Sequence, residues 1–400
     1  MANQKGFNMR VGLTNCRAVQ AGAVLPDATV VFDGGVVSSI TAGGVPADWD
    51  EEVNCQGKLV TAGLIDIQIN GGGGHMFSLS STSGAYEEIL RAHASLGTTS
   101  VCPTIISGPL DDMENAVRLA ASFAEQNVPA NRSRVLGIHI EGPFLSAGKR
   151  GGHAEEYLLE PSVEVAQRLI DAGGGHVRIF TLAPELPGSA EVIRFLRQRG
   201  VFVSLGHSKA EARDAAAAFR QGARGATHLF NAMEGMTSRA PGLVGASIAD
   251  PDVYVGIIGD LLHVDAVAVR AALLAKGPHR AYLTTDAVSP LGALADSFDL
   301  YGVRVSVRDG GCYTDSGVLA GTATPLATMV RNMVDYVGLS VPAAVQLATR
   351  TPAEVIGKHL FFGSLSGGMA ADAVVWNDDM SVDTVWIGGH ECSSQWSRMA

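Results

Sequence analysis

The sequence predicts an α/β protein in which a (β/α)8 barrel of the TIM type carries a small β-sandwich formed by both ends of the chain. β-rich runs alternate with helical periodicity through the middle of the chain, as in parallel sheets. Eight such runs occur, which is the number that closes a barrel. Both ends are β-rich without helices between the runs. An open doubly wound sheet is the alternative, but no G-x-G-x-x-G follows the first strand.

The composition excludes several classes of protein. With 46% hydrophobic and 17% charged residues among 400, the chain can bury a large core and is not disordered. The 29 Lys and Arg against 40 Asp and Glu give a net charge of −11, and we find no basic cluster beyond Lys149-Arg150. Nucleic-acid binding depends on such clusters, so we expect no nucleic-acid partner.

Targeting signals are equally sparse. No stretch approaches the ~20 apolar residues of a membrane helix, and the first ten residues lack the apolar core of a signal peptide. The five cysteines are scattered and form no C-x-x-C motif, which is typical of buried thiols in a reducing compartment. We therefore expect a cytoplasmic protein without a membrane partner.

The two ends are each expected to form a hairpin. Residues 28–40 divide at Asp33-Gly34-Gly35, and residues 372–389 divide around Asn377-Asp378-Asp379. Neither hairpin can bury a core alone, so we expect them to pair. This assigns residues 1–62 and 363–400 to the β-sandwich and residues 63–362 to the barrel.

The barrel elements follow in order. The predicted strands are 64–70, 98–105, 135–141, 178–184, 201–207, 225–228, 254–260 and 281–286. The predicted helices are 85–96, 110–126, 163–172, 191–199, 209–221, 264–276 and 324–336. Most of these helices are followed by a glycine, the usual left-handed stop. The glycine run 71–74 lacks the Gly-Lys-Ser/Thr ending of a phosphate-binding loop and is expected to be a flexible loop.

Polar side chains fall at the ends of the predicted strands. In a parallel barrel all these ends meet at one mouth, where active sites are built. Glu141, His207 and His228 together provide a carboxylate and two imidazoles, the ligand set of a catalytic metal site with one open position. Any one of them alone is better explained as a hydrogen-bonded structural residue, but their joint placement favours a site. His139 is expected to support Glu141 from the same strand face.

The sequence contexts of these residues carry a resemblance. LVTAGLIDIQING, HIEGPFLS, GHSKA, THLFNAM and TTDA, with RTPAEVIG and GGMAAD near the end, are similar to the amidohydrolase superfamily and, within it, to the N-acetylglucosamine-6-phosphate deacetylases. The resemblance implies metal-dependent removal of acetate from N-acetylglucosamine 6-phosphate, giving glucosamine 6-phosphate, in amino-sugar catabolism or cell-wall recycling. Alternatives are a deacetylase of N-acetylgalactosamine 6-phosphate or another N-acyl sugar phosphate, and a non-catalytic binding protein.

The resemblance also assigns roles to residues. Asp286 is expected to act as the catalytic acid and base, and His153 to polarise the acetyl carbonyl. The sugar phosphate is expected to contact a further set: Gly152, Asn231, Ala232, Arg239, Asp260, His263, Leu319, Ala320 and Gly321. In the family this arginine reaches the neighbouring active site, which implies a homodimer.

The first barrel strand departs from the superfamily. Many amidohydrolases have His-x-His there, whereas this chain has Gln68-x-Asn70. Neutral amides bind a borderline divalent ion poorly, so this second-metal position is expected to be vestigial. We expect one divalent metal ion per subunit. Zinc is the first choice, with iron or another divalent ion as alternatives, and such an ion lowers the pKa of a bound water towards neutrality.

Overall fold

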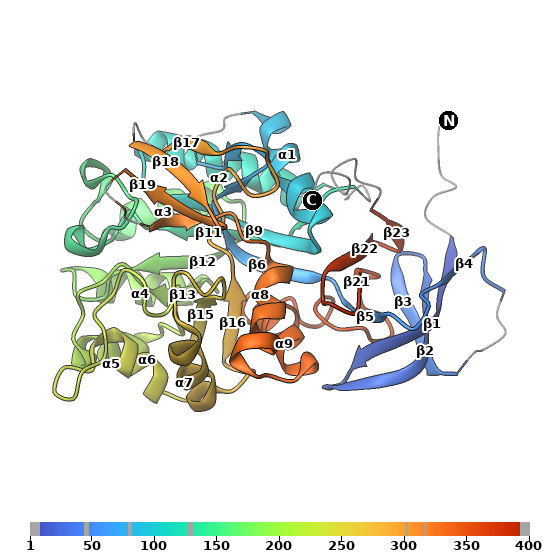
Figure 1. The fold of residues 1–400 in the computed structure, drawn as a ribbon. Helices are drawn as coiled ribbons and strands as arrows, with labels where there is room; N and C mark the ends of the chain where they lie inside the picture. The colour runs from blue at the N-terminus through green and yellow to red at the C-terminus, as the bar shows by residue number, and fades with distance from the viewer. Residues whose placement is uncertain are drawn as a thin grey trace.

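The computed structural model describes residues 9–43, 48–78, 82–126, 131–300, 303–315, 317 and 319–392. Strands from the beginning and the end of the chain lie together on one side, and the alternating strands and helices form the larger body beside them (Figure 1). This arrangement confirms the predicted fold class.

Eight parallel strands form the barrel, and each corresponds to a predicted strand. They are β6 Leu64–Ile69, β9 Thr98–Ile106, β11 Ile138–Glu141, β12 Val177–Leu182, β13 Phe202–Leu205, β14 Gly225–Ala226, β15 Tyr254–Ile258 and β16 Ala281–Thr284. They are hydrogen-bonded in this order, and the short strand β10 Arg134–Val135 pairs with the first half of β9, ahead of β11, which pairs with its second half. β6 and β16 meet through a bridge between Ile69 and Ala287, which closes the barrel.

A buried aspartate strengthens this closure. Asp66 on β6 is fully buried and accepts hydrogen bonds from the hydroxyls of Thr284 at 2.7 Å and Thr285 at 2.6 Å. It also accepts the backbone N–H of Thr285 at 3.1 Å. Thr285 directly precedes Asp286. The hydrogen bonds between the first and last strands therefore also hold the backbone next to this predicted catalytic residue.

The seven predicted helices are present with small shifts in their ends. They are α1 Ser83–Ser95, α2 Leu110–Ala124, α3 Val163–Ala172, α4 Ser189–Gln198, α5 Ala212–Gln221, α7 Ala266–Lys276 and α8 Leu326–Asn332, which continues into a π turn at Met333–Val337. The short helices α6 Gly242–Ala249, α9 Val341–Leu347 and α10 Arg350–Val355 were not predicted. The sequence of α6, GLVGASIA, has almost no polar face, so periodicity could not indicate it.

The terminal strands form one hydrogen-bonded sheet in the order β23-β22-β21-β5-β1-β2-β3, with β4 also paired to β1. The strands are β1 Arg10–Gln20, β2 Ala23–Asp33, β3 Val36–Ala42, β4 Glu51–Asn54, β5 Leu59–Ala62, β21 Ala373–Trp376, β22 Val382–Ile387 and β23 His390–Glu391. Both predicted hairpins are present and share a core that includes Phe32 and Trp386. Residues 1–8, 44–47 and 393–400 of the predicted sandwich lie outside the described residues.

Two parts of the mouth differ from expectation. A four-stranded sheet that was not predicted, β17 Ser297–Leu300, β18 Val303–Arg308, β19 Gly311–Thr314 and β20 Leu319–Thr322, follows β16. The glycine run is not a flexible loop, because β7 Gly71–Gly72 pairs with β8 His75–Met76 in a packed hairpin. A Cβ on Gly71 would lie 2.3 Å from the carbonyl oxygen of His75, so glycine is needed for close packing rather than for freedom.

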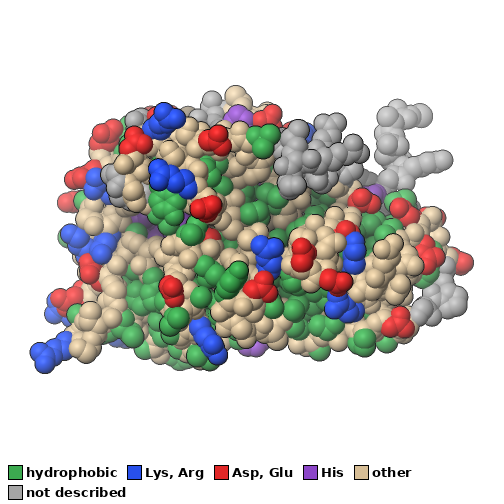
Figure 2. Space-filling model, viewed as in Figure 1, with side chains coloured by type: hydrophobic (Ala, Val, Ile, Leu, Met, Phe, Trp, Pro, Cys, Tyr) green, Lys and Arg blue, Asp and Glu red, His purple; other side chains and the backbone are tan. Residues whose placement is uncertain are grey.

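The surface agrees with the composition. On the face shown in Figure 2, Lys and Arg side chains lie scattered among Asp and Glu. In the described part of the chain, no helix is long and apolar enough to cross a membrane. All five cysteines are free thiols.

Candidate active site

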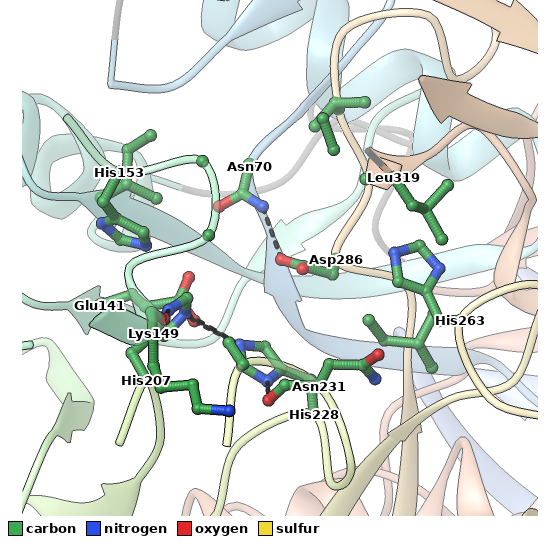
Figure 3. Close-up of a pocket in the computed structure, with 18 of the residues that line it drawn as sticks. Asn70, Glu141, Lys149, His153, His207, His228, Asn231, His263, Asp286 and Leu319 are labelled. Carbon is green, nitrogen blue, oxygen red and sulfur yellow. Dashed lines mark hydrogen bonds and ion pairs between the residues drawn. The ribbon is translucent and has the colours of Figure 1, made fainter. Parts of the chain in front are cut away.

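Three predicted site residues share an unusual backbone conformation just past their strands. His207, His228 and Asp286 follow β13, β14 and β16 and have φ values of 48°, 34° and 55°. A positive φ is sterically costly for residues other than glycine and is concentrated at functional sites. Each turn redirects the side chain from the strand end towards the centre of the mouth, where Glu141 at the end of β11 meets them (Figure 3).

Glu141, His207 and His228 converge on one point. The Oε1 atom of Glu141 lies 3.3 Å from Nε2 of His207 and 3.1 Å from Nε2 of His228. The two Nε2 atoms are 3.0 Å apart, and all three residues are buried. Their ligand atoms lie within 4.8 Å of one another, which is the spacing of groups that share a metal ion.

The loops behind the imidazoles orient them for this task. Nδ1 of His207 donates to the carbonyl of Lys149 at 2.9 Å, and Nδ1 of His228 donates to the carbonyl of Asn231 at 3.2 Å. A carbonyl can only accept, so each Nδ1 carries the proton and each Nε2 presents its lone pair. Two lone pairs and a buried carboxylate aimed at one point fit a divalent cation.

The electrostatics point the same way. Burial raises the pKa of Glu141, but hydrogen bonds and charge from His207 and His228 outweigh burial and hold it well below its usual value. Burial lowers the pKa of His228, yet contact with Glu141 raises it overall. The buried carboxylate therefore requires positive charge beside it, which a metal ion supplies as well as a proton does.

Asp286 lies across from this cluster, held by the two amides of the first strand. Nδ2 of Asn70 donates to Oδ1 of Asp286 at 2.6 Å, and Nε2 of Gln68 donates to the same oxygen at 3.3 Å. Gln68 also donates to Oε1 of Glu141 at 2.9 Å. Burial, followed by the negative charge of Glu141, raises the pKa of Asp286. A carboxylate with a raised pKa is suited to accept a proton near neutral pH.

His153 lies on the other side of the predicted ligands. Its ring centre is 4.6 Å from that of His207, and its Nδ1 contacts the hydroxyl of Ser107 at 2.9 Å. Burial, together with nearby His207, lowers the pKa of His153 to about 3. The ring is therefore neutral at ordinary pH and acts as a hydrogen-bond donor or acceptor rather than as a cation.

The three predicted ligands, Asp286, Asn70 and His153 line a cavity of about 400 Å³, which is the size of a small-ligand site. It gathers most of the predicted substrate contacts, namely Gly152, Asn231, Ala232, His263, Leu319, Ala320 and Gly321. Strand β20 supplies the last three, so the unpredicted sheet forms one wall. In Figure 3, His153 and His263 lie on opposite sides of Asp286, so the cavity has one end at His153 and the other at His263.

Two predicted contacts lie elsewhere. Asp260 is buried behind His263, and its Oδ2 accepts a hydrogen bond from Nδ1 of His263 at 2.7 Å. It also accepts the backbone N–H groups of Leu262 and His263, each at 2.9 Å. Arg239 is exposed on the segment between His228 and α6, outside the cavity lining. Asp260 thus supports a lining residue instead of lining the cavity itself.

The sequence did not indicate several residues of the site. Lys149 lines the cavity, and its Nζ lies 3.2 Å from both the carbonyl of Met233 and a carboxylate oxygen of Glu234. The available signals were its place in the basic pair Lys149-Arg150 and its position a few residues before His153. The apolar lining residues Met76, Ile106, Ile258 and Val288 have no sequence signature that separates them from the core.

The arrangement matches a known family. The profile described as "Amidohydrolase family" aligns with residues 59–392. The chain belongs to the amidohydrolase family. Among similar structures, the crystal structure of N-acetylglucosamine-6-phosphate deacetylase from Pasteurella multocida is 35% identical, with a TM-score of 0.90 over 96% of this chain and 100% of that chain.

Named relatives of this amidohydrolase differ in the sugar they act on. The N-acetylgalactosamine-6-phosphate deacetylase of Shewanella sp. (strain ANA-3) is 40% identical over 338 residues, covering 83% of this chain and 82% of the relative. The N-acetylglucosamine-6-phosphate deacetylase of Bos taurus is 35% identical over 397 residues, covering 95% and 94%.

Proposed function

We propose that this chain hydrolyses the N-acetyl group of N-acetylglucosamine 6-phosphate to glucosamine 6-phosphate and acetate. The observation that carries the proposal is the convergence of Glu141, His207 and His228 opposite a hydrogen-bonded Asp286 in one cavity. The relatives named above support the choice of a phosphorylated N-acetyl amino sugar. Amino-sugar catabolism or cell-wall recycling in the cytoplasm is the setting that we propose.

The side chains divide the reaction between them. Asp286 accepts a proton from the attacking water as the C–O bond forms. It then gives that proton to the sugar nitrogen as the C–N bond breaks, because an unprotonated amine is too basic to leave. His153 donates a hydrogen bond to the acetyl oxygen while negative charge develops there. Gln68 and Asn70 hold the Asp286 carboxylate in position for both transfers.

Glu141, His207 and His228 would hold one divalent metal, for which we propose zinc. When bound, the ion acidifies water and polarises the acetyl carbonyl. Gln68 and Asn70 turn their N–H groups towards the two carboxylates, which is unfavourable for a second cation between them. We expect elemental analysis to give one metal per chain, with activity lost on chelation and restored by Zn²⁺. Two stoichiometric metals would contradict this assignment.

The phosphate end is assigned to His263, backed by Asp260, and to Arg239 from a second subunit. An imidazole N–H and a guanidinium are suitable donors to a phosphate. Because Arg239 is exposed and outside the cavity lining of its own chain, we propose a homodimer in which it completes the partner's site.

A deacetylase of N-acetylgalactosamine 6-phosphate is the second candidate. The relative from Shewanella sp., 40% identical, bears that name, and the two sugars differ only in one hydroxyl configuration. The deciding experiment is acetate release from both 6-phosphates and from their unphosphorylated forms, with and without chelator. Preference for the gluco epimer supports the main proposal, and preference for the galacto epimer replaces it. No acetate from any of them would favour a non-catalytic binding protein.

A further inference from the structure

We propose that Ser107, just past the C-terminal end of β9, is a positioning residue that fixes the proton of His153 on Nε2. This makes His153 a hydrogen-bond donor towards the cavity rather than a third imidazole ligand beside Glu141. The role of that donor towards an acetyl oxygen rests on the proposed function, whereas the position of the proton does not.

The argument begins with Nδ1 of His153. The backbone N–H of Ser107 points at this atom with a nitrogen–nitrogen distance of 3.3 Å. A backbone N–H can only donate, so Nδ1 must offer a lone pair. The hydroxyl of Ser107 lies 2.9 Å from the same atom and donates to it. A neutral imidazole with Nδ1 as acceptor carries its proton on Nε2.

The partners of Nδ1 separate the three imidazoles of the site. His207 and His228 face the carbonyls of Lys149 and Asn231, which can only accept, so their Nε2 atoms are free to ligate. His153 faces an N–H group, so its Nε2 is occupied by a proton. Although His153 packs against His207 with ring centres 4.6 Å apart, it cannot offer Nε2 to a metal.

Ser107 is held where it can do this. Its side chain is fully buried, and Gly142 follows Glu141 directly in the adjacent loop. A Cβ on Gly142 would lie 2.3 Å from Oγ of Ser107, so the two loops pack closely around the hydroxyl. Gly142 also has a φ of 96°, which glycine adopts more readily than other residues. A glycine after Glu141 therefore allows the turn that follows this glutamate and leaves space for the side chain of Ser107.

Nitrogen NMR of the zinc-loaded protein, with ¹⁵N-labelled histidine rings and His153→Gln to assign the signal, reads the tautomer directly. We expect His153 in the Nε2–H form, and His207 and His228 in the Nδ1–H form. An Nδ1–H or doubly protonated His153 would overturn the proposal. The tautomer of His153 is read without any substrate. The NMR result can therefore contradict this proposal while acetate release supports the proposed function, or support this proposal while no acetate is released.

Kinetics of Ser107→Ala test the consequence. The variant keeps the backbone N–H but loses the hydroxyl, so we expect kcat to fall about 10-fold with little change in KM, below the about 10²–10³-fold cost of losing an oxyanion donor outright. Ser107→Thr keeps a hydroxyl, so its kcat should stay close to that of the unmodified protein. Ser100→Ala is the matched control, because Ser100 is a buried serine on β9, the strand that leads to Ser107, and its hydroxyl has no partner among the described residues. Equal kcat values for Ser107→Ala and Ser100→Ala would refute the role.

Discussion

Single residues at the mouth carry conformations that their side chains do not favour. His207, His228 and Asp286 are left-handed where glycine would cost less, so the rest of the barrel must hold them there. Sequence reasoning found these residues because each is the last residue of a predicted strand. It missed Ser107, which follows β9, and Lys149, which lies in a loop after β11, because serines and lysines are common in such places and only their contacts reveal a role.

Replacing Asp286 tests the proton transfers at this scale. Asp286→Asn keeps the size of the side chain and cannot accept the proton, so kcat should fall by about 10²–10⁴-fold. Metal content and KM should remain near those of the unmodified protein. Turnover close to normal would remove Asp286 from the mechanism. Asp112→Asn, the same substitution at an exposed position on α2, is the control and should leave kcat unchanged.

Replacing Asp260 tests the support of His263. Asp260→Asn removes the charge that faces Nδ1, so the KM for the 6-phosphate should rise about 10-fold or more, as expected for a lost hydrogen bond to a charged group. The kcat should change little. The unphosphorylated sugar provides the comparison, and an equal rise in its KM would argue against a phosphate role for His263.

At the level of elements, the strands and most helices of the barrel could be predicted from the sequence, whereas the inserted sheet and the glycine hairpin at its mouth could not. Strands and helices of the barrel are buried in continuous runs or on one face, so their patterns are strong. The inserted sheet β17–β20 has mixed burial, such as the pattern of β18 in which a single residue is buried, and it gave no clear signal. The glycine hairpin was misread because Gly72 and Gly73 pack closely against α1, while Gly73 and Gly74 have the positive φ that a tight turn requires.

The contact between α1 and this hairpin predicts a dependence of stability on pH. His93 on α1 donates Nε2–H to the carbonyl of Gly71 at 2.9 Å, and burial lowers its pKa to about 4. In the unfolded chain it titrates near 6.5. The unfolded state therefore binds more protons between these values, and the stabilisation present above pH 6.5 is lost as the pH falls towards 4.

Comparison with His93→Gln isolates this effect, because glutamine keeps the donor without titrating. Relative to that variant, the free energy of unfolding should fall by about 3 kcal/mol between pH 7.5 and pH 4. Chemical denaturation of both proteins across this range provides the measurement. Parallel curves for the two proteins would show that His93 does not titrate in this way.

At the level of the whole molecule, the proposed dimer decides whether one chain suffices for turnover. Arg239→Ala and Asp286→Asn should each be nearly inactive. If the arginine acts across the interface, mixing and reassociating the two variants should restore about a quarter of normal activity, because half of the random dimers contain one intact site of two. If it acts within its own chain, no mixture recovers, since no site then has both residues.

The joining of both chain ends in one sheet also has a consequence for biosynthesis. Strand β5 pairs with β21, and roughly 300 residues of barrel lie between them, which takes about 15–60 s to synthesise at 5–20 residues per second. During that interval the growing polypeptide exposes an unpaired hydrophobic edge on the ribosome. Nascent chains that stall before β21 emerges should therefore be prone to aggregation and dependent on chaperones.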